Sequence, residues 1–398
     1  MSLRLLTLLV ATALGAAEPV RVYHAARPGA LEKTRALIAA GDETARQAFK
    51  KLVADADKAL LVEPPSVTAK AKVPPSGDKH DYLSLAPYFW PDPSKPAGLP
   101  YLRKDGQVNP ESRDEAANDT LRMRLLGKSV ETLGLAYHFT KDERYAAHAA
   151  RMLRVWFLAP ETRMNPHLRY AQAVAGKNDG RGTGILESRY VGFAADAAGL
   201  LQDSAAWTES DRRQFDQWLG VFLDWLLTSA PGRDEAAAQN NHGTWFDVQA
   251  VQIALALGRH DVAKRLLQDV PVKRYGVQIK ADGRQPLELV RTTSFGYSCY
   301  NLEAHAMLAN FGDHLGVDLW RARSGEGSFR VALDFLTPYL ETPPARKWPY
   351  PQIKAEGAEE MLPVLRLAAL AYRDPAYEAL ITAHADARGK RFQLLFPR

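Results

Sequence analysis

Apolar residues recur at helical spacing along most of the chain after about residue 115. Leu121, Leu125, Leu133 and Tyr137 line one face of an expected helix, and a second apolar stripe over residues 145–156 follows a short polar turn. The two segments predict a helical hairpin. No segment shows the sustained alternation of apolar and polar residues that a half-buried strand requires. The pattern therefore predicts an all-α chain.

Further helical segments follow the same rhythm. Thr208 and Asp211 have the spacing of an N-terminal capping box ahead of an apolar stripe over residues 215–226. A helix that includes residues 245–255 is expected to end near Gly258. Later pairs fall within residues 302–316, 326–340 and 357–384. Because each pair must bury its apolar stripe against its neighbours, the series favours an α/α toroid, an incomplete barrel of six or seven helical hairpins.

One long segment, residues 73–113, departs from this helical rhythm. It is rich in proline and glycine and too irregular for a helix. Disordered segments are poor in aromatic residues, whereas this one is rich in them. We call it the aromatic loop. It is expected to form the wall of a sugar-binding cleft through His80, Tyr82, Tyr88, Trp90 and Tyr101, or else to pack its own aromatic rings onto the helices.

The N-terminal residues 1–17 have one arginine, an apolar run and small residues at the end, as in a secretory signal peptide. Residues 18–398 are then expected to form a single mature domain, periplasmic or secreted, with no membrane anchor after signal removal. The only cysteine, Cys299, excludes a disulfide within the chain. The sequence gives no indication of the oligomeric state.

The chain carries a formal net charge of +5, which mildly favours anionic partners. No run of five or more basic residues marks a nucleic-acid or membrane patch, so no nucleic-acid partner is expected. The ten histidines show no His-Glu-x-x-His pattern, so neither a metal site nor a cofactor is expected.

Two polar segments, residues 239–245 and 288–298, each precede an expected helix. The first contains Asn241 and His242, which could merely cap the helix. The second contains Arg291 and Tyr297, which could be an ion-paired arginine and a packed tyrosine in a loop. Taken together, the two segments suit one reaction, the β-elimination of a 4-O-linked uronate.

Elimination removes the proton at C5, beside the uronate carboxylate, and protonates the oxygen that leaves C4. Asn241, His242 and Arg291 are donors that could neutralise the carboxylate, and the arginine could grip it through two hydrogen bonds. Tyr297 could act as base and then acid if nearby cations lower its pKa. His242 is the alternative base, for a substrate whose C5 proton lies on the opposite face.

A third segment around residues 165–184 is also rich in polar residues. Tyr170, Gln172 and Arg181 could bind sugar hydroxyls or carboxylates beside the cleavage point, or could belong to a structural turn. Asn240 and Trp245, which flank the first polar group, complete the set of expected substrate-binding residues. These assignments predict an anionic polysaccharide as the partner.

Four segments occur together in a recognisable order: residues 80–93, residues 98–110, residues 240–245, and residues 291–298. In this combination the chain resembles the alginate lyase domain family, helical-toroid lyases that cut alginate and related polyuronates to 4,5-unsaturated oligouronates. The resemblance implies that an asparagine and a histidine neutralise the carboxylate, an arginine supports the site and a tyrosine is acid and base. The matching residues are Asn241, His242, Arg291 and Tyr297.

The chain departs from the alginate-specific members at Gly243 and Thr244, where those carry a serine and an aromatic residue. The aromatic loop is also typical of a branch in which glucuronan is cleaved, so a glucuronan lyase is an alternative. A glycoside hydrolase on the same fold would need two carboxylates across a cleft. A non-catalytic periplasmic polysaccharide-binding protein would have little reason to keep Tyr297 with Arg291 and His242.

Overall fold

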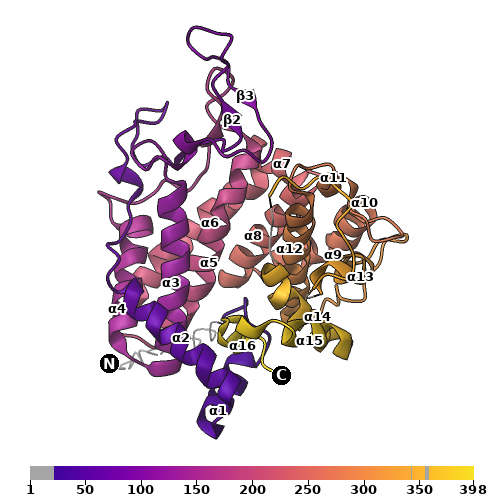
Figure 1. Cartoon of the computed structure of the whole chain (residues 1–398). Coiled ribbons are helices and arrows are strands. Elements are labelled where there is room, and N and C mark those ends of the chain that lie inside the picture. Colours follow the sequence, from indigo (N-terminus) through magenta and orange to yellow (C-terminus); the bar gives the residue numbers. More distant parts are fainter. Residues whose placement is uncertain (1–21, 342, 355–357) are drawn as a thin grey trace, which may run out of the picture.

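The computed structural model describes residues 22–341, 343–354 and 358–398. The expected signal peptide, residues 1–17, lies outside the described residues. The chain is mostly helical, as predicted (Figure 1). Within the described residues, no helix is both long and apolar enough to cross a membrane.

The core of the fold is a curved row of inner helices in which each helix packs on the next. The row runs through α3 (Thr120–Thr140), α5 (Arg189–Ala198), α8 (Asn241–Ala256), α12 (Ser294–Leu315) and α14 (Leu362–Tyr372). Outer helices back this row: α4 (Glu143–Leu153), α6 (Glu209–Thr228), α9 (His260–Val270), α13 (Phe329–Leu340) and α15 (Pro375–Thr382). This arrangement confirms the predicted helical toroid.

The inner helices pack closely because small residues stand at their contacts. Gly127 of α3 faces α5 so tightly that an added Cβ would lie 2.5 Å from the Tyr190 carbonyl oxygen. In α8, Trp245, Val248 and Val251 are all buried, as their spacing predicts. The predicted apolar face of α3 is wrong at one position, because Leu125 is 41% exposed.

The helix starts follow local capping rules, with one shift from the prediction. Thr208 and Asp211 form the expected capping box at the start of α6, where each side chain accepts from the backbone N–H of the other. Helix α8 starts at Asn241, earlier than the sequence indicated, and Asn240 is its cap: the Asn240 side chain accepts from the His242 N–H at 3.2 Å. His242 therefore lies in the first turn of the helix.

The aromatic loop contains short strands that the sequence pattern did not reveal. Strand β1 (Leu83–Leu85) pairs in parallel with β4 (Tyr170–Ala173), and β2 (Phe89–Trp90) pairs antiparallel with β3 (Leu102–Arg103). Strands this short cannot show an apolar alternation. The β2–β3 hairpin projects from one end of the molecule, at the top of Figure 1.

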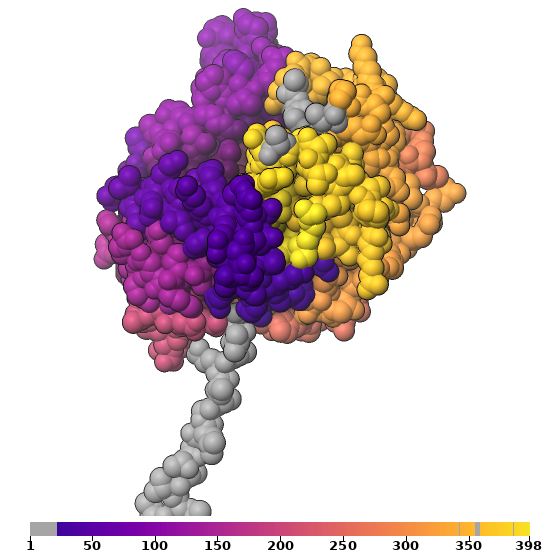
Figure 2. Space-filling model, turned by 60° about the horizontal axis from the view of Figure 1, so that its bottom comes forward, coloured from indigo at the N-terminus to yellow at the C-terminus, as the bar shows by residue number. Residues whose placement is uncertain are grey.

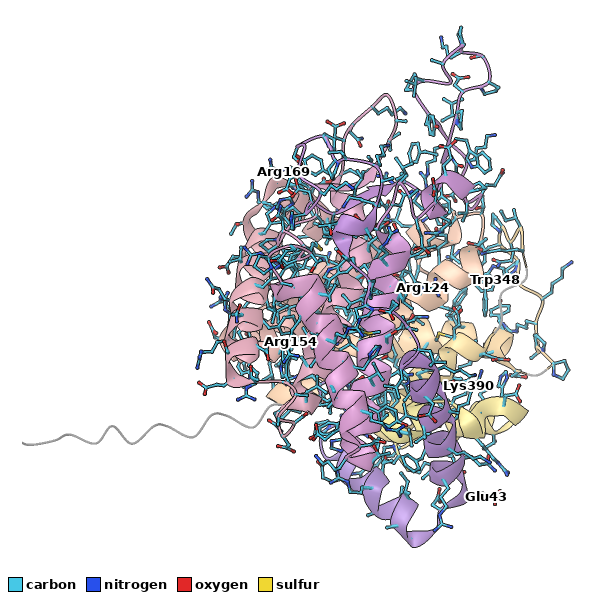
Figure 3. The ribbon with its side chains drawn as sticks, turned by 90° about the vertical axis from the view of Figure 1, so that its left-hand side faces the viewer. Glu43, Arg124, Arg154, Arg169, Trp348 and Lys390 are labelled. Carbon is cyan, nitrogen blue, oxygen red and sulfur yellow. The ribbon has the colours of Figure 1, made fainter. Side chains whose placement is uncertain are left out.

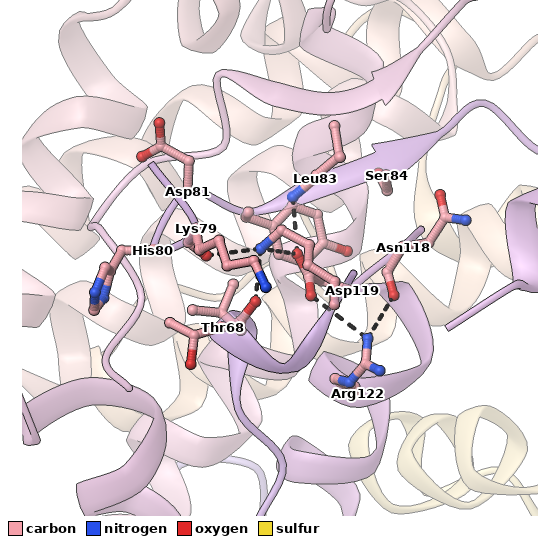
Figure 4. A network of polar contacts seen from close by, with 12 residues as sticks. Thr68, Lys79, His80, Asp81, Leu83, Ser84, Asn118, Asp119 and Arg122 are labelled. Carbon is pink, nitrogen blue, oxygen red and sulfur yellow. Dashed lines mark hydrogen bonds and ion pairs between the residues drawn. The ribbon is translucent and has the colours of Figure 1, made fainter. Parts of the chain in front are cut away.

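A buried ion pair ties the start of the aromatic loop to α3. The Lys70 ammonium lies 3.0 Å from the Asp119 carboxylate, and both side chains are fully buried. Lys70 also donates to the Lys79 carbonyl at 2.9 Å, and Asp119 accepts from the Leu83 N–H at 3.0 Å (Figure 4). The other Asp119 oxygen has no hydrogen-bond partner and lies 3.8 Å from Arg122. The network nevertheless fixes where the loop leaves the helices, because it joins both ends of the buried ion pair to loop backbone.

The two ends of the described chain meet at the base of the toroid, opposite the hairpin. There α1 (Ala30–Ala40) and α2 (Glu43–Ala59) pack against α16 (Phe392–Leu395), and α2 also packs on α3. The N-terminal and C-terminal surfaces adjoin in Figure 2. His24 donates its backbone N–H to Asp196 of α5 at 2.8 Å, and Asn310 of α12 donates to the His24 carbonyl at 2.9 Å. These contacts join helices that are distant in sequence.

Candidate functional site

A cleft of about 1200 Å³ opens between the aromatic loop and the ends of the inner helices. Three further short helices border it: α7 (Ala230–Ala236), α11 (Pro286–Leu289) and the 3₁₀ segment Gly182–Ser188. Another short helix, α10 (Gly276–Gln278), is not part of the lining and is joined to α8 by a hydrogen bond from the Thr244 hydroxyl to Gln278. The cleft reaches down to Arg124 on α3, which is labelled in Figure 3. Of the residues predicted from sequence, those that line it are Tyr88, Gln172, Arg181, Asn240, Asn241, His242, Arg291 and Tyr297.

Two of the residues predicted to bind substrate are buried in the protein interior instead. The Tyr82 side chain has no exposed surface, and its hydroxyl donates to Glu187 at 2.7 Å. Trp245 is 1% exposed and stacks on Tyr300 with ring centroids 4.8 Å apart. This placement corrects the prediction that Tyr82 and Trp245 contact the substrate. Both side chains support residues that line the cleft.

Four other residues predicted to bind substrate do not line the cleft. The His80 ring contacts the Arg163 carbonyl, and the Trp90 indole donates to the Gln107 carbonyl within the aromatic loop. The Tyr101 hydroxyl donates to a glutamate, and Tyr170 lies on β4. The aromatic loop thus packs much of its own aromatic surface, and contributes Tyr88 and Phe89 to the cleft.

Asn241 is the first residue of α8 and is held by a buried carboxylate. Its backbone N–H and its side-chain amide both donate to Glu288, at 2.6 and 2.7 Å. This double contact sets the orientation of the amide, because only its nitrogen can donate to a carboxylate. The side-chain oxygen of Asn241 has no hydrogen-bond partner although it is buried. Such a partnerless polar atom at a cleft is consistent with a site for a polar ligand.

His242 is oriented by a second buried carboxylate. Its Nδ1 lies 2.6 Å from Oε1 of Glu235, which is at the end of α7 and 2% exposed. A carboxylate can only accept, so Nδ1 carries the proton in this contact. Nε2 of the neutral ring is then the nitrogen with the free lone pair. The pair has the form in which a histidine acts as a general base.

Arg291 lies between α11 and α12 and binds a carboxylate of the protein itself. Its Nε and Nη2 both donate to Asp105 of the aromatic loop, with the shortest contact at 2.6 Å. Nη2 also donates to the Tyr297 hydroxyl at 2.7 Å, and the guanidinium lies 3.7 Å from the centre of the Tyr297 ring. The two-bond grip expected for a substrate carboxylate is therefore made on Asp105.

Tyr297, in the first turn of α12, is held in the protonated form. Burial raises its pKa well above the usual value of tyrosine, and the neighbouring Tyr88 adds to the increase, while Arg291 acts in the opposite direction. A Tyr297 base would need Arg291 to lower this pKa, but in the structure the effect of burial is larger than that of Arg291. The Tyr297 hydroxyl donates to the Tyr88 hydroxyl at 3.0 Å. In this state Tyr297 is a proton donor.

Gln172 and Arg181 form one wall of the cleft. Arg181 donates to the Gln172 carbonyl at 3.1 Å and to its side-chain oxygen at 2.8 Å, and its guanidinium lies over the Phe89 ring. Gln172 has a positive φ of 50°, a conformation that non-glycine residues seldom adopt. Strained backbone of this kind clusters at binding and catalytic sites. The pairing of β1 with β4 brings this wall to the aromatic loop.

The floor of the cleft contains Arg189, which sequence reasoning did not select. Its guanidinium packs between the rings of Tyr190, Trp245 and Tyr300 and donates to two of their hydroxyls. Glu235, Glu288 and Asp105 were not selected either. Their partners are distant in sequence or depend on turn geometry, so no local pattern marks them.

The described lining of the cleft has more positive than negative side chains. Its basic residues are Arg103, Arg113, Arg124, Arg181, Arg189, Arg291 and Lys354, and its acidic residues are Glu187, Asp234, Glu235 and Glu360. Such an excess attracts an anionic polymer. Among the described side chains, no group of three histidines, cysteines or acids is arranged to hold a metal ion.

Comparisons with known proteins agree with this fold. The family model for alginate lyase matches residues 66–346. The structure of an alginate lyase from Bacteroides ovatus is similar, with a TM-score of 0.88 and 41% identity over 94% of this chain and 98% of that one. Among curated proteins, none matches this sequence.

More distant structures share the fold. Alginate lyase A1-III from Sphingomonas species A1 has a TM-score of 0.60 and 18% identity, over 95% of this chain and 97% of that one. A histidine-to-alanine variant of that lyase, complexed with a tetrasaccharide, has a TM-score of 0.61 and 19% identity, over the same shares of the two chains. From the family match and the 41% identity over nearly the whole chain, this protein belongs to the alginate lyase family of polysaccharide lyases.

Proposed function

We propose that this enzyme cleaves alginate by β-elimination in the cleft between the aromatic loop and the inner helices. One observation carries the proposal: the first turns of α8 and α12 bring the His242 imidazole and the Tyr297 phenol into a single cleft with a positive lining. Two similar proteins are named as alginate lyases, which supports alginate as the substrate.

In the proposed mechanism, Asn241 and the start of α8 neutralise the uronate carboxylate. Asn241 lines the cleft but has no exposed surface in the free enzyme, so in this proposal its second N–H, beyond the one that it gives to Glu288, reaches the carboxylate only when the substrate is bound. The N-terminus of a helix also carries a partial positive charge, which stabilises a bound anion. These dipoles stabilise the negative charge that builds up on the carboxylate as the C5 proton leaves.

His242 and Tyr297 divide the proton transfers in this proposal. Nε2 of His242 takes the C5 proton, the electron pair forms the C4–C5 double bond, and the C4–O bond breaks. Tyr297 gives its proton to the departing oxygen. The cycle closes when the imidazolium loses its proton to water and Tyr297 regains one. The raised pKa of Tyr297 supports this division, since a tyrosine that is both base and acid would have to begin as phenolate.

Hydrolysis is less well supported, because the acids near the catalytic residues are already engaged. Glu235 is bound to His242, and Glu187 accepts hydrogen bonds from Tyr82 and Ser84 at 2.7 Å each. A hydrolase needs one free carboxylic acid and one free carboxylate facing the sugar. Glucuronan remains an alternative substrate, since its elimination would use the same donors.

We also propose that the enzyme is exported and that residues 1–17 are its signal peptide. Support comes from the sequence of this segment and from a substrate that is a large extracellular polymer. Expression of the full chain in a Gram-negative host, followed by N-terminal sequencing of periplasmic protein, tests the proposal. A periplasmic protein that starts near residue 18 is expected, and retention of the segment on a cytoplasmic protein would contradict it.

The test of function is an ultraviolet absorbance screen against polymannuronate, polyguluronate, glucuronan and hyaluronan. The 4,5-unsaturated uronate that elimination forms absorbs ultraviolet light, whereas a hydrolysis product does not. We expect absorbance to rise fastest with an alginate polymer. A faster rise with glucuronan would change the substrate assignment. Reducing ends released without absorbance would refute elimination.

The matched variants are Tyr297→Phe and Tyr101→Phe. Both remove one hydroxyl, but Tyr101 does not line the cleft. We expect Tyr297→Phe to abolish turnover and to keep oligosaccharide binding within a few-fold, whereas Tyr101→Phe retains turnover. Activity like that of the wild type in Tyr297→Phe would exclude Tyr297 from the mechanism.

A further inference from the structure

We propose that Asp105, on the aromatic loop, is a positioning residue that holds Arg291 against Tyr297, so that Arg291 serves the phenol and does not grip the substrate. This inference rests on the proposed function, because it concerns the placement of the proton donor. It assigns Asp105 to the reaction although its carboxylate has no contact with the reacting atoms.

The hydrogen bonds of Arg291 support this assignment. Nε donates to both Asp105 oxygens at 3.2 and 3.1 Å, and Nη2 donates to Asp105 at 2.6 Å and to Tyr297 at 2.7 Å. A two-bond grip on a carboxylate uses Nε with Nη2, or the two terminal nitrogens. Each of these two geometries uses a hydrogen of Nη2. Nη2 has only two hydrogens, and one binds Asp105 while the other binds Tyr297. Arg291 could grip a substrate only by releasing Asp105 or Tyr297.

The position of Arg291 determines the position of the phenol. The guanidinium carbon lies 3.7 Å from the centre of the Tyr297 ring, and one N–H contacts the hydroxyl oxygen. The Tyr297 hydroxyl in turn donates to Tyr88. The oxygen is therefore fixed from two sides, and the contact with Arg291 depends on Asp105.

Asp105 is itself fixed by a tight approach of two segments. Its Oδ2 accepts from the backbone N–H and the hydroxyl of Thr292, at 3.2 and 3.1 Å. The next residue, Gly106, has a φ of 72°, and a Cβ there would lie 2.4 Å from the Thr292 hydroxyl oxygen. The turn after β3 thus requires glycine in order to place Asp105 on Arg291. Arg103 donates to Asp105 from the exposed side at 2.8 Å.

The groups around the Tyr297 phenol make the role of Asp105 measurable. Asp105 and Tyr88 face it from the aromatic loop and raise its pKa, whereas Arg291 lowers it. Glu288 on α11 is the next charged group and interacts with Arg291, and His242 on α8 lines the same cleft. Removal of the Asp105 charge alone should lower the pKa of Tyr297. Because Tyr297 must be protonated to act as the acid, a variant without the Asp105 charge should then lose activity at a lower pH than the wild type.

The decisive experiment measures kcat and KM for Asp105→Ala, Arg291→Ala and the double variant on the polymer that the wild type cleaves. We expect Asp105→Ala to lower kcat at least about tenfold with KM within about threefold. The double variant should be no slower than Arg291→Ala, because Asp105 acts through Arg291. An unchanged kcat, or a lower KM that shows Arg291 freed to bind substrate, would overturn the inference.

A second variant separates positioning from folding. Asp105→Asn keeps an acceptor for Arg291 and removes the charge, and its alkaline loss of kcat should move to lower pH. Asp92→Asn is the matched control, since Asp92 lies on the same loop and its carboxylate accepts from the backbone N–H and hydroxyl of Ser94, away from the cleft lining. Equal melting temperatures exclude unfolding. If Tyr297→Phe is inactive but Asp105→Asn keeps the wild-type kcat and pH profile, the inference about Asp105 fails and the proposed function stands. If Tyr297→Phe is active, both the inference and the proposed role of Tyr297 are refuted.

Discussion

Replacing Glu235 with glutamine would remove the carboxylate that orients His242 and keep the size of the side chain. Glu235 is 2% exposed and lies 2.6 Å from Nδ1 of His242. A glutamine amide could donate to Nδ1 instead of accepting from it. The proton of the ring would then move to Nε2, the nitrogen that faces the cleft in the proposed mechanism. We expect a folded enzyme with a greatly reduced kcat.

The size of the effect follows from the contact that is lost. A hydrogen bond to a charged group contributes about 1.5–3 kcal/mol. At about 1.4 kcal/mol for each factor of ten, its loss in the transition state lowers kcat about 10- to 150-fold. A complete change of tautomer costs more: the corresponding change of carboxylate to amide in a serine protease lowers kcat about 10⁴-fold. The expected decrease lies between these limits.

The assay is the initial rate of ultraviolet absorbance on the best polymer of the screen, with melting temperature recorded for each variant. Glu209→Gln is the control, because Glu209 is an exposed residue that pairs with Arg213 on α6. It should keep the wild-type rate. If Glu235→Gln stays folded and its kcat is within threefold of the wild type, the assignment of His242 as an oriented base is refuted.

Three further variants test the fold. Burial lowers the pKa of His305 to about 3, below the usual value of about 6.5. The free energy of unfolding should therefore fall by about 1.4 kcal/mol per pH unit as the pH drops between these values. In His305→Asn the melting temperature should fall less on acidification. Lys70→Met leaves the buried Asp119 carboxylate with only Arg122, at 3.8 Å, as a cation, and chemical denaturation should show a loss of up to about 3–5 kcal/mol. An unchanged stability would contradict the network. Gly127→Ala places a Cβ 2.5 Å from the Tyr190 carbonyl and should cost about 1–3 kcal/mol, whereas a higher melting temperature would show that α3 and α5 separate freely.

Most of the fold could be predicted because its signals are local. Helical spacing of apolar residues marked the inner and outer helices, and the pair Thr208 and Asp211 marked the start of α6. The error at Leu125 shows the limit of this reasoning. A single helix has an apolar face, but which edge of that face remains exposed depends on the neighbouring helices.

The sequence indicated which residues are catalytic candidates, but it did not indicate which other residues contact them. Asn241 and His242 stand near a helix start, which is visible in the sequence. The acids that orient them come from α7 and α11, and no spacing rule joins those segments. Arg291 shows the difference most clearly: its type suits a carboxylate, but the structure shows that the carboxylate belongs to Asp105, 186 residues earlier in the chain.

The contacts between the two ends of the described chain, at the base of the toroid, affect how the chain folds. Contacts of His24 reach partners 172 and 286 residues further along, so the segment near residue 24 gains its hydrogen bonds only after α5 and α12 are in place. Closing loops of this length costs entropy before any contact forms, and folds with many such contacts reach the native state slowly. Because the two ends of the described chain lie together, a circular permutant that links them and opens the chain at an exposed turn between an inner helix and its outer partner should still form the toroid. It should change the order in which the toroid closes.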